Sequence, residues 1–516
     1  MARMLWRSAS LNHRNQSFLD RAAVMTLELL ADCNPLDVAN MLWAFARLEV
    51  GDDAAIHALV DLARRRTEEF PPQELANVLW ALATLEIYDQ PILGATELRM
   101  ASGTELSAQD VANTLWAFAT VVHRSATWNS GVSDALAGVV LEVLPEASSQ
   151  EFANLLWAVA TLLLGNAAIH DAIDAMTSLK LSPRGYPYDS SGARHPTCAF
   201  GIVHGLRLLG RLSEKHFQAA EEVCRDWAAV NDGKDFATTS GDGRGSDGHL
   251  SLGGGVSDAM PFLLRDTPHL CVLWKPPGWT VSVSHSSVAE AHAADVPGVQ
   301  GGRAPRLQDW IKKTLGVDHS IALDPSAAYG LLHRLDRDTS GSILCAKSYL
   351  GFYMAQLQFE ARQLRKTYLC ICEKHAPSSC PWCIEKPLAS QRGRAFVSDR
   401  GKTAKTEVVQ VSHLHDESGR PFSLLQVDLH TGRLHQIRAH LSSIGHPLLG
   451  DEMYGGKPWV RVMLHASRLK LDVPSLATSV DAHAPIPEDF RTALESMVPC
   501  SPRCSLTSRK ETAQPA

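Results

Sequence analysis

The sequence predicts a multidomain protein in which an all-α helical-repeat solenoid precedes an α/β domain. Three observations support this fold class. A chain of 516 residues is too long for a single hydrophobic core. A short motif recurs four times in the first half of the chain at a nearly constant interval. From about residue 262 the pattern changes to short apolar runs separated by glycine and proline, which is typical of β-strands.

The recurring motif has the form Ala-Asn-x-Leu-Trp-Ala-x-Ala. Its tryptophans are 37, 36 and 41 residues apart, and they are Trp43, Trp80, Trp116 and Trp157. A fixed period in this range is the mark of a helical solenoid. Within each copy Ala, Leu, Trp and Ala stand at positions i, i+3, i+4 and i+7, which is the buried stripe of an amphipathic helix. We therefore expect the tryptophans to serve packing only.

Helix starts are also visible in the sequence. The segments 107–110 (Ser-Ala-Gln-Asp) and 148–151 (Ser-Ser-Gln-Glu) resemble capping boxes, in which the first and fourth residues satisfy each other's backbone N–H groups. Asn34 followed by Pro35 offers a helix cap with proline in the first turn. These signals place a helix start shortly before three of the four motifs.

A second amphipathic segment follows each motif, for example residues 53–66 and 131–144, so the predicted repeat is a helix pair. Residues 198–212 are expected to be a degraded fifth copy. The pattern over residues 30–212 is similar to the octotricopeptide-type repeats of organelle RNA-processing proteins, which implies RNA recognition. However, residues 1–256 carry 19 Lys and Arg against 31 Asp and Glu, which disfavours a surface that grips phosphate. A protein partner for the repeats is therefore the alternative.

Composition suggests the outer boundaries of the domains. The first 19 residues contain Arg3, Arg7 and Arg14 and no acid, which is compatible with an organelle transit peptide. We expect a mitochondrial or chloroplast protein, with cytoplasm and nucleus as alternatives. No apolar run has membrane length, so a membrane partner is not expected. The expected segments are a basic N-terminus at 1–19, a repeat domain at 20–230, a Gly/Asp/Ser-rich linker at 231–258, a catalytic domain at 259–499 and a disordered tail at 500–516.

A polar loop at residues 332–341 lies between two apolar segments, and such loops often carry catalytic groups. Asp336 stands in it between Arg334 and Arg337. Nearby positive charge favours the anionic form of a carboxyl group. Asp336 is therefore a candidate nucleophile rather than a proton donor. From composition alone, a solvated surface turn with an ion pair is the more common alternative.

The letters of this loop, His333-Arg-Leu-Asp-Arg-Asp-Thr-Ser-Gly341, resemble the signature of the RluA-type RNA pseudouridine synthases. Segments 365–372, 429–440 and 464–466 resemble further motifs of that family, in the family's order. The strand-like segment 270–281 resembles its opening motif, with Trp274 where the family usually has Asp. The resemblance implies an α/β pseudouridine synthase fold with a mixed, mostly antiparallel sheet. It also implies isomerisation of specific uridines in RNA, with no cofactor and no metal.

The same resemblance assigns the site residues. Asp336 would be the nucleophile toward the ribose, and Arg438 its partner in a bidentate ion pair. Tyr368 would stack on the target base or transfer a proton at its C5 atom, unless it is simply a strand aromatic. The remaining residues are assigned to substrate binding: Arg334, which would replace the extruded base, His435, Gln436, and Leu464, which would form an apolar wall of the uracil pocket.

Two further alternatives remain open. Cys370, Cys372, Cys380 and Cys383 lie within 14 residues, but their spacing is not a standard zinc pattern, so free thiols are expected. An RNA-binding or scaffold protein with an inactive synthase domain is the rival function, and the joint presence of the three catalytic candidates argues against it. The second half of the chain carries 30 Lys and Arg against 25 Asp and Glu, which fits RNA binding. Ribosomal, transfer and messenger RNA are all open as targets.

Overall fold

The computed structural model divides the chain into two compact units, Met1–Trp227 and Ala228–Ala516. Apart from their first residues, the expected linker and tail lie outside the described part of the chain. No helix among the described residues is long and apolar enough to cross a membrane. The described residues are 1–48, 50, 53–102, 106–121, 130–164, 166–182, 196–232, 259–281, 304–391, 393–399 and 401–500.

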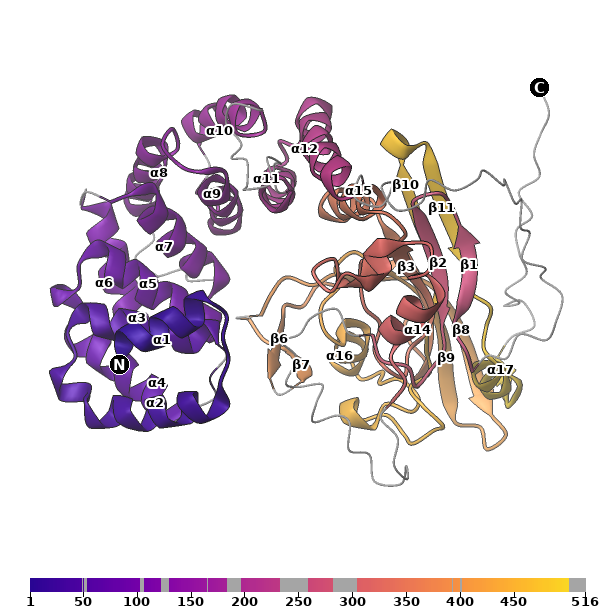
Figure 1. Cartoon of the computed structure of the whole chain (residues 1–516). Coiled ribbons are helices and arrows are strands. Elements are labelled where there is room, and N and C mark those ends of the chain that lie inside the picture. Colours follow the sequence, from indigo (N-terminus) through magenta and orange to yellow (C-terminus); the bar gives the residue numbers. More distant parts are fainter. Residues whose placement is uncertain are drawn as a thin grey trace. The chain divides into compact units, whose positions relative to one another are not determined.

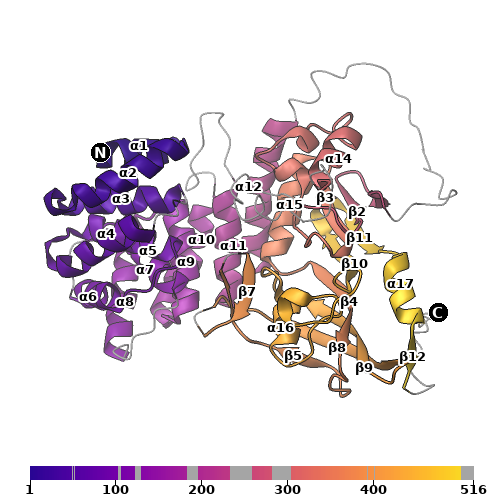
Figure 2. The same ribbon diagram turned by 90° about the horizontal axis from the view of Figure 1, so that it is seen from below.

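The first unit is helical (Figures 1 and 2), which confirms that prediction. Its odd-numbered first helices lie side by side in chain order, from α1 to α11. Each is followed by an even-numbered second helix, as expected for stacked helix pairs. The bounds are α1 (Ala2–Ser10), α2 (Gln16–Glu28), α3 (Pro35–Arg47), α4 (Asp53–Arg65), α5 (Pro72–Thr84), α6 (Gln90–Ala101), α7 (Ala108–Thr120), α8 (Ser130–Val143), α9 (Ser149–Leu162), α10 (Ala167–Lys180), α11 (Thr197–Leu208) and α12 (Glu214–Asp232).

The predicted helix caps are present. At the start of α7, the Ser107 hydroxyl accepts the backbone N–H of Asp110, whose carboxylate accepts the N–H of Ser107. Ser148 and Glu151 form the same reciprocal pair at the start of α9. The first motif helix, α3, also begins with a capping box, in which Asn34 replaces serine. Local sequence therefore fixes where these helices begin.

The prediction of a buried helical stripe is confirmed for its alanine and leucine positions and is wrong for its tryptophan position. In α3, Ala39, Leu42 and Ala46 are buried, whereas Trp43 is only half-buried. The tryptophans of α5, α7 and α9 are half-buried in the same way. Apolar packing between the helices is thus supplied mainly by the small and aliphatic residues.

One helix pair was not foreseen. Helix α1 packs against α3, and its Trp6 precedes Trp43 by 37 residues, the interval found between the later copies. Arg3 and Arg7 stand where the other copies have asparagine and alanine, and these differences hide the motif. Leu5 and Ala9 are buried in the stack.

The second unit is built on a mixed sheet with ten strands among the described residues, in the order β1-β2-β3-β10-β4-β9-β8-β12, with β11 on β10 and β5 on β8. Among the strands that the structure describes, only β3 and β10 are paired in parallel, so the sheet is mostly antiparallel, as predicted. A separate hairpin pairs β6 with β7. The strands are β1 (Phe262–Asp266), β2 (Leu270–Lys275), β3 (Ser340–Ala346), β4 (Arg365–Glu373), β5 (Trp382–Ile384), β6 (Leu388–Gln391), β7 (Arg394–Val397), β8 (Thr406–Asp416), β9 (Pro421–Leu429), β10 (Leu464–Val473), β11 (Thr478–His483) and β12 (Met497–Pro499).

Helices cover both faces of this sheet. On one face, α14 and α16 pack apolar side chains against Tyr368 and Cys370 of β4. On the other face, Phe490 of α17 packs against Ile371, because neighbouring residues of a strand point to opposite faces. The central strand is therefore buried on both sides and rigid. The helices of this unit are α14 (Leu307–Thr314), α15 (Tyr349–Glu360), α16 (Gln436–Ser442) and α17 (Glu488–Glu495).

Candidate active site

The backbone of the polar loop around Asp336 is held in place by a buried lysine. Lys275, at the end of β2, is fully buried, and its ammonium donates to the carbonyl oxygens of Pro276, Arg337 and Thr339 at 2.9, 2.8 and 2.7 Å. All three N–H donors of the ammonium are therefore used. Burial lowers the pKa of Lys275 to about 7, against the opposing charges of nearby carboxylates. The loop backbone is thereby fixed on both sides of Asp338.

A buried arginine just before β10 holds the same loop. Arg461 donates to the Asp338 carbonyl oxygen at 3.0 Å and forms a two-pronged ion pair with Asp489 of α17, at 2.5 and 2.9 Å. Where β3 passes β10, Gly341 has a φ of 123°, and a Cβ there would lie 2.2 Å from the carbonyl oxygen of Ala466. Only glycine allows this close parallel pairing. It brings the end of the Asp336 loop against the start of β10.

The Asp336 carboxylate faces Arg438 of α16. The two residues are 102 positions apart in the chain, and Arg438 Nη1 donates to Asp336 Oδ2 at 3.3 Å. Arg438 also donates through Nε and Nη2 to both oxygens of Asp451, at 2.7 and 2.8 Å. Burial opposes the charged guanidinium, but the hydrogen bonds and charges of Asp451 and Asp336 outweigh it and raise the pKa of Arg438. Arg438 is thus a fixed cation beside Asp336.

This geometry differs from the expectation in two respects. The bidentate partner of Arg438 is Asp451, so Asp336 receives a single, longer hydrogen bond. Arg337, expected to hold Asp336 ionised, pairs instead with its neighbour Asp338 at 2.9 Å. The Asp336 side chain keeps 22% of its surface exposed, compared with 1% for Asp451. The less engaged carboxylate is therefore the one that can reach a substrate.

His435 lies on the other side of Asp336. It caps α16 with a left-handed backbone, φ 47°, and its Nε2 lies 3.9 Å from Asp336 Oδ1. Its Nδ1 lies 3.1 Å from the Tyr454 hydroxyl. Burial lowers the pKa of His435, partly opposed by the charge of Asp336. A neutral imidazole within reach of the carboxylate and the substrate is therefore expected at neutral pH.

The Gln436 side chain makes its hydrogen bonds within the protein. Its amide N–H groups donate to the Lys405 carbonyl and the Thr406 hydroxyl at 3.0 and 2.9 Å. Its carbonyl oxygen accepts from the Thr431 hydroxyl and the Arg433 N–H at 2.7 and 3.0 Å. Since its donors are both used within the protein, Gln436 holds the 431–436 loop, rather than contacting substrate as expected.

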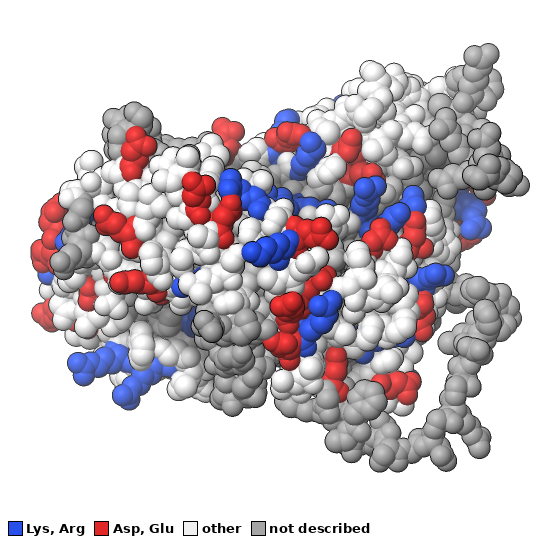
Figure 3. Space-filling view, turned by 90° about the horizontal axis from the view of Figure 1, so that it is seen from above, with Lys and Arg blue, Asp and Glu red and all other residues white. Residues whose placement is uncertain are grey.

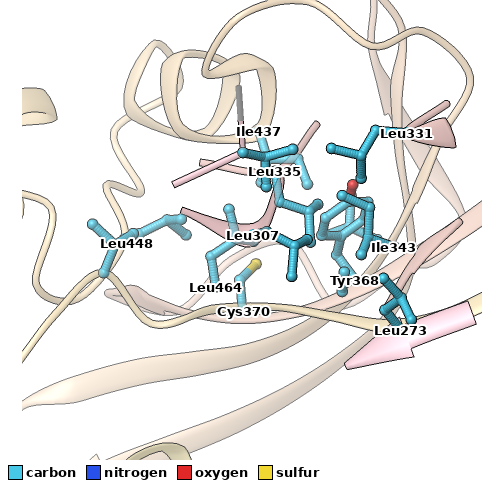
Figure 4. Packing of buried hydrophobic residues seen from close by; sticks show 14 of the residues in the cluster. Leu273, Leu307, Leu331, Leu335, Ile343, Tyr368, Cys370, Ile437, Leu448 and Leu464 are labelled. Atoms are coloured by element: carbon cyan, nitrogen blue, oxygen red, sulfur yellow. The ribbon is translucent and has the colours of Figure 1, made fainter. Parts of the chain in front are cut away.

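Tyr368 and Leu464 pack in the apolar core cluster that includes Leu335 of the loop (Figure 4). Both are buried in one cluster that includes Leu331, Leu335 and Ile343. The Tyr368 hydroxyl has no hydrogen-bond partner among the described residues. Burial, and then the charge of Asp336, raises the pKa of Tyr368, so it is a protonated phenol at neutral pH. The structure thus brings Tyr368, Leu464 and Asp336 together.

The start of the loop is fixed by His333, whose Nε2 accepts the Leu344 N–H at 3.0 Å. Burial lowers the pKa of His333 to about 3, so the imidazole is neutral and can accept that bond. The next residue, Arg334, is exposed, and its charge contributes to lowering the pKa of His435. Arg334 therefore stands at the solvent side of the same site.

The cysteine cluster does not gather into a metal centre. Cys370 and Cys372 are buried in the core under the site, whereas Cys383 is exposed. Among the described residues no group of three or more His, Cys, Asp or Glu is placed to hold a metal ion. Trp274, which replaces the family's usual Asp, is fully buried and packs against Phe262 with ring centroids 5.8 Å apart. The side chain that departs from the family pattern therefore lies in the hydrophobic core.

Comparison with known proteins addresses this domain directly. Residues 269–443 match the model of the RNA pseudouridylate synthase family. The second unit therefore carries a pseudouridine synthase domain. An uncharacterized RNA pseudouridine synthase of Bacillus subtilis (strain 168) is 39% identical over 166 residues, covering 31% of this chain and 53% of the relative. Ribosomal large subunit pseudouridine synthase D of Pseudomonas aeruginosa is 35% identical over 181 residues, covering 31% of this chain and 54% of the relative.

The chain thus spans about half the length of the curated relatives that its synthase domain matches. Among solved structures, human RNA pseudouridylate synthase domain containing 1 is similar, with 23% identity and a TM-score of 0.34, covering 49% of this chain and 94% of that chain. In the first unit, residues 8–181 match the model of the N-terminal domain of the Tbc2 translation factor. The octotricopeptide type of the repeats has no support beyond the sequence motif.

Three residues that hold the synthase site were missed from the sequence. Asp451 orients Arg438, while Lys275 and Arg461 fix the loop backbone. Asp451 stands in the segment 450–455, which follows the 429–440 motif, so a search for a second carboxylate near Arg438 could have found it. Nothing in the local sequence shows that a lysine or arginine is buried, because burial depends on strands distant in the chain.

Proposed function

We propose that this protein is an RNA pseudouridine synthase that isomerises specific uridines in RNA. One observation carries the proposal. Asp336, the partly exposed carboxylate of the matched domain, lies 3.3 Å from the fixed cation Arg438, and its charge acts on the phenol of Tyr368, which packs in the same apolar cluster as Leu464. A carboxylate that is charged, positioned and next to a wall for a flat base is what nucleophilic chemistry on a nucleoside needs.

In the proposed reaction, Asp336 attacks C1′ of the ribose, and the N1–C1′ bond breaks as the uracil leaves. The base then turns, and C5 bonds to C1′ as the bond between Asp336 and C1′ breaks and the carboxylate leaves. The proton on C5 is lost to solvent and N1 takes up a proton. No atom is gained or lost, so the product is an isomer of uridine. Arg438 places a fixed positive charge beside Asp336, because a guanidinium cannot lose its proton near neutral pH.

Tyr368 supports this reaction as a wall rather than as a base. A phenol with a raised pKa holds its proton at neutral pH, and accepting the C5 proton would require the phenolate. Its ring and Leu464 offer an apolar surface on which uracil can stack. Of the two roles considered for Tyr368, stacking therefore has the better support.

The target uridine must leave its stack to reach Asp336, because an enzyme that acts on a paired base has to extrude it. Arg334, exposed beside His435, is placed to fill the vacated position. We also infer that the helical repeats aid recognition of the RNA or of a protein partner. Which ribosomal, transfer or messenger RNA is modified is a matter for mapping pseudouridines after loss of the protein.

The test is release of tritium from RNA that carries 5-tritiated uridine, prepared from cells lacking this protein. The wild-type chain should release tritium, and Asp336→Asn should reduce the rate by at least about 10⁴-fold, as loss of a nucleophile does elsewhere. Asp338→Asn, in the same loop, is the matched control and should retain most of the activity. Equal background release from wild type and Asp336→Asn would favour the rival role of an RNA-binding or scaffold protein with an inactive domain.

For the compartment we propose an organelle, on the basis of the arginine-bearing N-terminus and the organelle-type repeat motif. Imaging the full chain fused to a fluorescent protein at its C-terminus tests this proposal. Diffuse cytosolic fluorescence would contradict the organelle assignment.

A further inference from the structure

A row of tryptophan rings runs along the first helices of the repeat unit. Neighbouring ring centroids lie 6.4, 6.1, 6.2 and 6.3 Å apart, in the order Trp6, Trp43, Trp80, Trp116 and Trp157. Trp6 is 45% exposed, and the other four are half-buried. The row therefore keeps part of each ring open to solvent, although the alanines and leucines beside the rings are buried. We call these five residues the tryptophan row.

Amide side chains form a second row next to it. Each stands three positions before a tryptophan, on the same face of its helix, and is half-buried: Asn40, Asn77, Asn113 and Asn154. The first three make no hydrogen bond within the described part of the chain, and Asn154 accepts one from Gln150 at 3.1 Å. A half-buried amide without a partner costs stability, and alanine would favour the helix more. A use for these amides outside the fold would explain their presence in four of the five helices that carry the tryptophan row.

The first helices, which carry the tryptophan row, contribute little of the net charge of the repeat unit, and Arg47 lies over the Trp43 ring with its guanidinium carbon 5.4 Å from the ring centroid. The six first helices together carry four Lys or Arg and four Asp or Glu. The six second helices together carry seven Lys or Arg and fourteen Asp or Glu. Lys and Arg side chains lie interspersed with Asp and Glu on the face shown in Figure 3. The acidity that disfavoured RNA binding thus belongs mainly to the second helices, and the first helices are neutral.

We propose that the tryptophan row and its asparagines bind an unpaired segment of RNA. Aromatic faces stack on bases of any sequence, and amides hydrogen-bond to base edges. The ring spacing is close to twice the roughly 3.4 Å rise of stacked bases, so one base per ring requires bases unstacked from each other, as in single-strand recognition. One aromatic and one amide per repeat match a chain of repeating nucleotides better than an irregular protein surface.

This inference deepens the proposed function and rests on it in one respect, namely that the bound RNA is the synthase substrate. The binding itself is tested without catalysis, by fluorescence anisotropy of the full chain with labelled, unstructured 12-nucleotide RNA. The triple variant Asn40→Ala, Asn77→Ala, Asn113→Ala should weaken binding by at least about tenfold. The control Gln16→Ala, Gln90→Ala, Gln218→Ala removes three exposed amides from second helices and should bind like wild type. Equal affinity of the asparagine variant and wild type would overturn the proposal and favour a packing or protein-binding role.

A second measurement locates the RNA on the chain. The same oligonucleotide with 4-thiouridine is photocrosslinked to the full chain, and the modified peptides are identified by mass spectrometry. Adducts should fall on the peptides that contain Trp43, Trp80 and Trp116. Adducts confined to the synthase domain would contradict the proposal even if that domain is active. Adducts on the tryptophan row without tritium release would support RNA binding by the row and contradict only the proposed function.

Discussion

Around Asp336 the charged side chains are joined in a hydrogen-bonded network, whereas three asparagine side chains on the first helices of the repeats have no partner among the described residues. Asp451 takes two hydrogen bonds from Arg438, and all three N–H donors of Lys275 are used by carbonyl oxygens. Asn40 and Asn77, by contrast, make no hydrogen bond within the described residues. Closed networks hold reacting groups at fixed positions. Side-chain amides that have no partner within the protein are available to hydrogen-bond to a ligand. We therefore infer that the region around Asp336 serves chemistry and that the first helices of the repeats serve binding.

The largest expected effect comes from opening the closed network. Asp451→Asn removes the charge that orients Arg438 but keeps the shape of the side chain. We expect the rate of pseudouridine formation to fall about 10²-fold, since small misplacements of reacting groups have effects of this size. Breaking a buried ion pair should also lower the free energy of unfolding by about 3 kcal/mol. Tritium release measures the rate, and urea denaturation measures the stability. An unchanged rate would show that the reaction does not depend on the charge of Asp451.

Backbone packing under the loop offers the next test. Gly341→Ala would place a Cβ 2.2 Å from a backbone oxygen of β10, and this clash must push β3 away from β10. We therefore expect the free energy of unfolding to fall by at least about 3 kcal/mol and most of the activity to be lost. Gly419→Ala is matched, because it also has a positive φ of 77° but open space around the added atom. It should cost only about 1 kcal/mol. Similar losses in both variants would show that the close approach of β3 and β10 is unimportant.

Acid should weaken the synthase domain through its buried histidines. Burial lowers the pKa of His333 to about 3 and that of His465 to about 4, whereas both take up protons near 6.5 when unfolded. The unfolded chain then binds more protons between pH 6.5 and 4, so stability is present above pH 6.5 and is lost as the pH falls. Each histidine contributes a slope of about 1.4 kcal/mol per pH unit. Urea midpoints measured across this range should fall less steeply for His465→Asn than for wild type. The exposed His483→Asn should leave the slope unchanged.

The smallest effect is expected in the repeats. Ser148→Ala removes the cap of α9 and should lower the stability of the repeat unit by about 1 kcal/mol, because one backbone N–H loses its partner. Ser178→Ala, at an exposed position of α10, should change it by less than about 0.5 kcal/mol. Thermal unfolding followed by circular dichroism makes the comparison. A larger loss would mean that the first helices depend on distant contacts as much as the site does.

Sequence predicted the repeats better than the site because repeat structure is local. The caps of α3, α7 and α9 involve residues three positions apart, so short motifs reveal them. Even there, the exposure of Trp43 could not be foreseen, since the helical stripe that includes it also contains buried leucine and alanine. In the site, the family motifs named Asp336 and Arg438 correctly as neighbours. The geometry that decides their roles, with Asp451 as the bidentate partner, depends on the fold between them.

One measurement tests the division between chemistry and binding most directly. Single-turnover rates of tritium release are recorded against enzyme concentration for wild type, for Asp451→Asn and for the triple asparagine variant. Asp451→Asn should lower the maximal rate about 10²-fold and leave the half-saturating concentration nearly unchanged. The asparagine variant should keep the maximal rate within about twofold and raise the half-saturating concentration at least about tenfold. A lowered maximal rate with unchanged half-saturation in the asparagine variant would contradict the account.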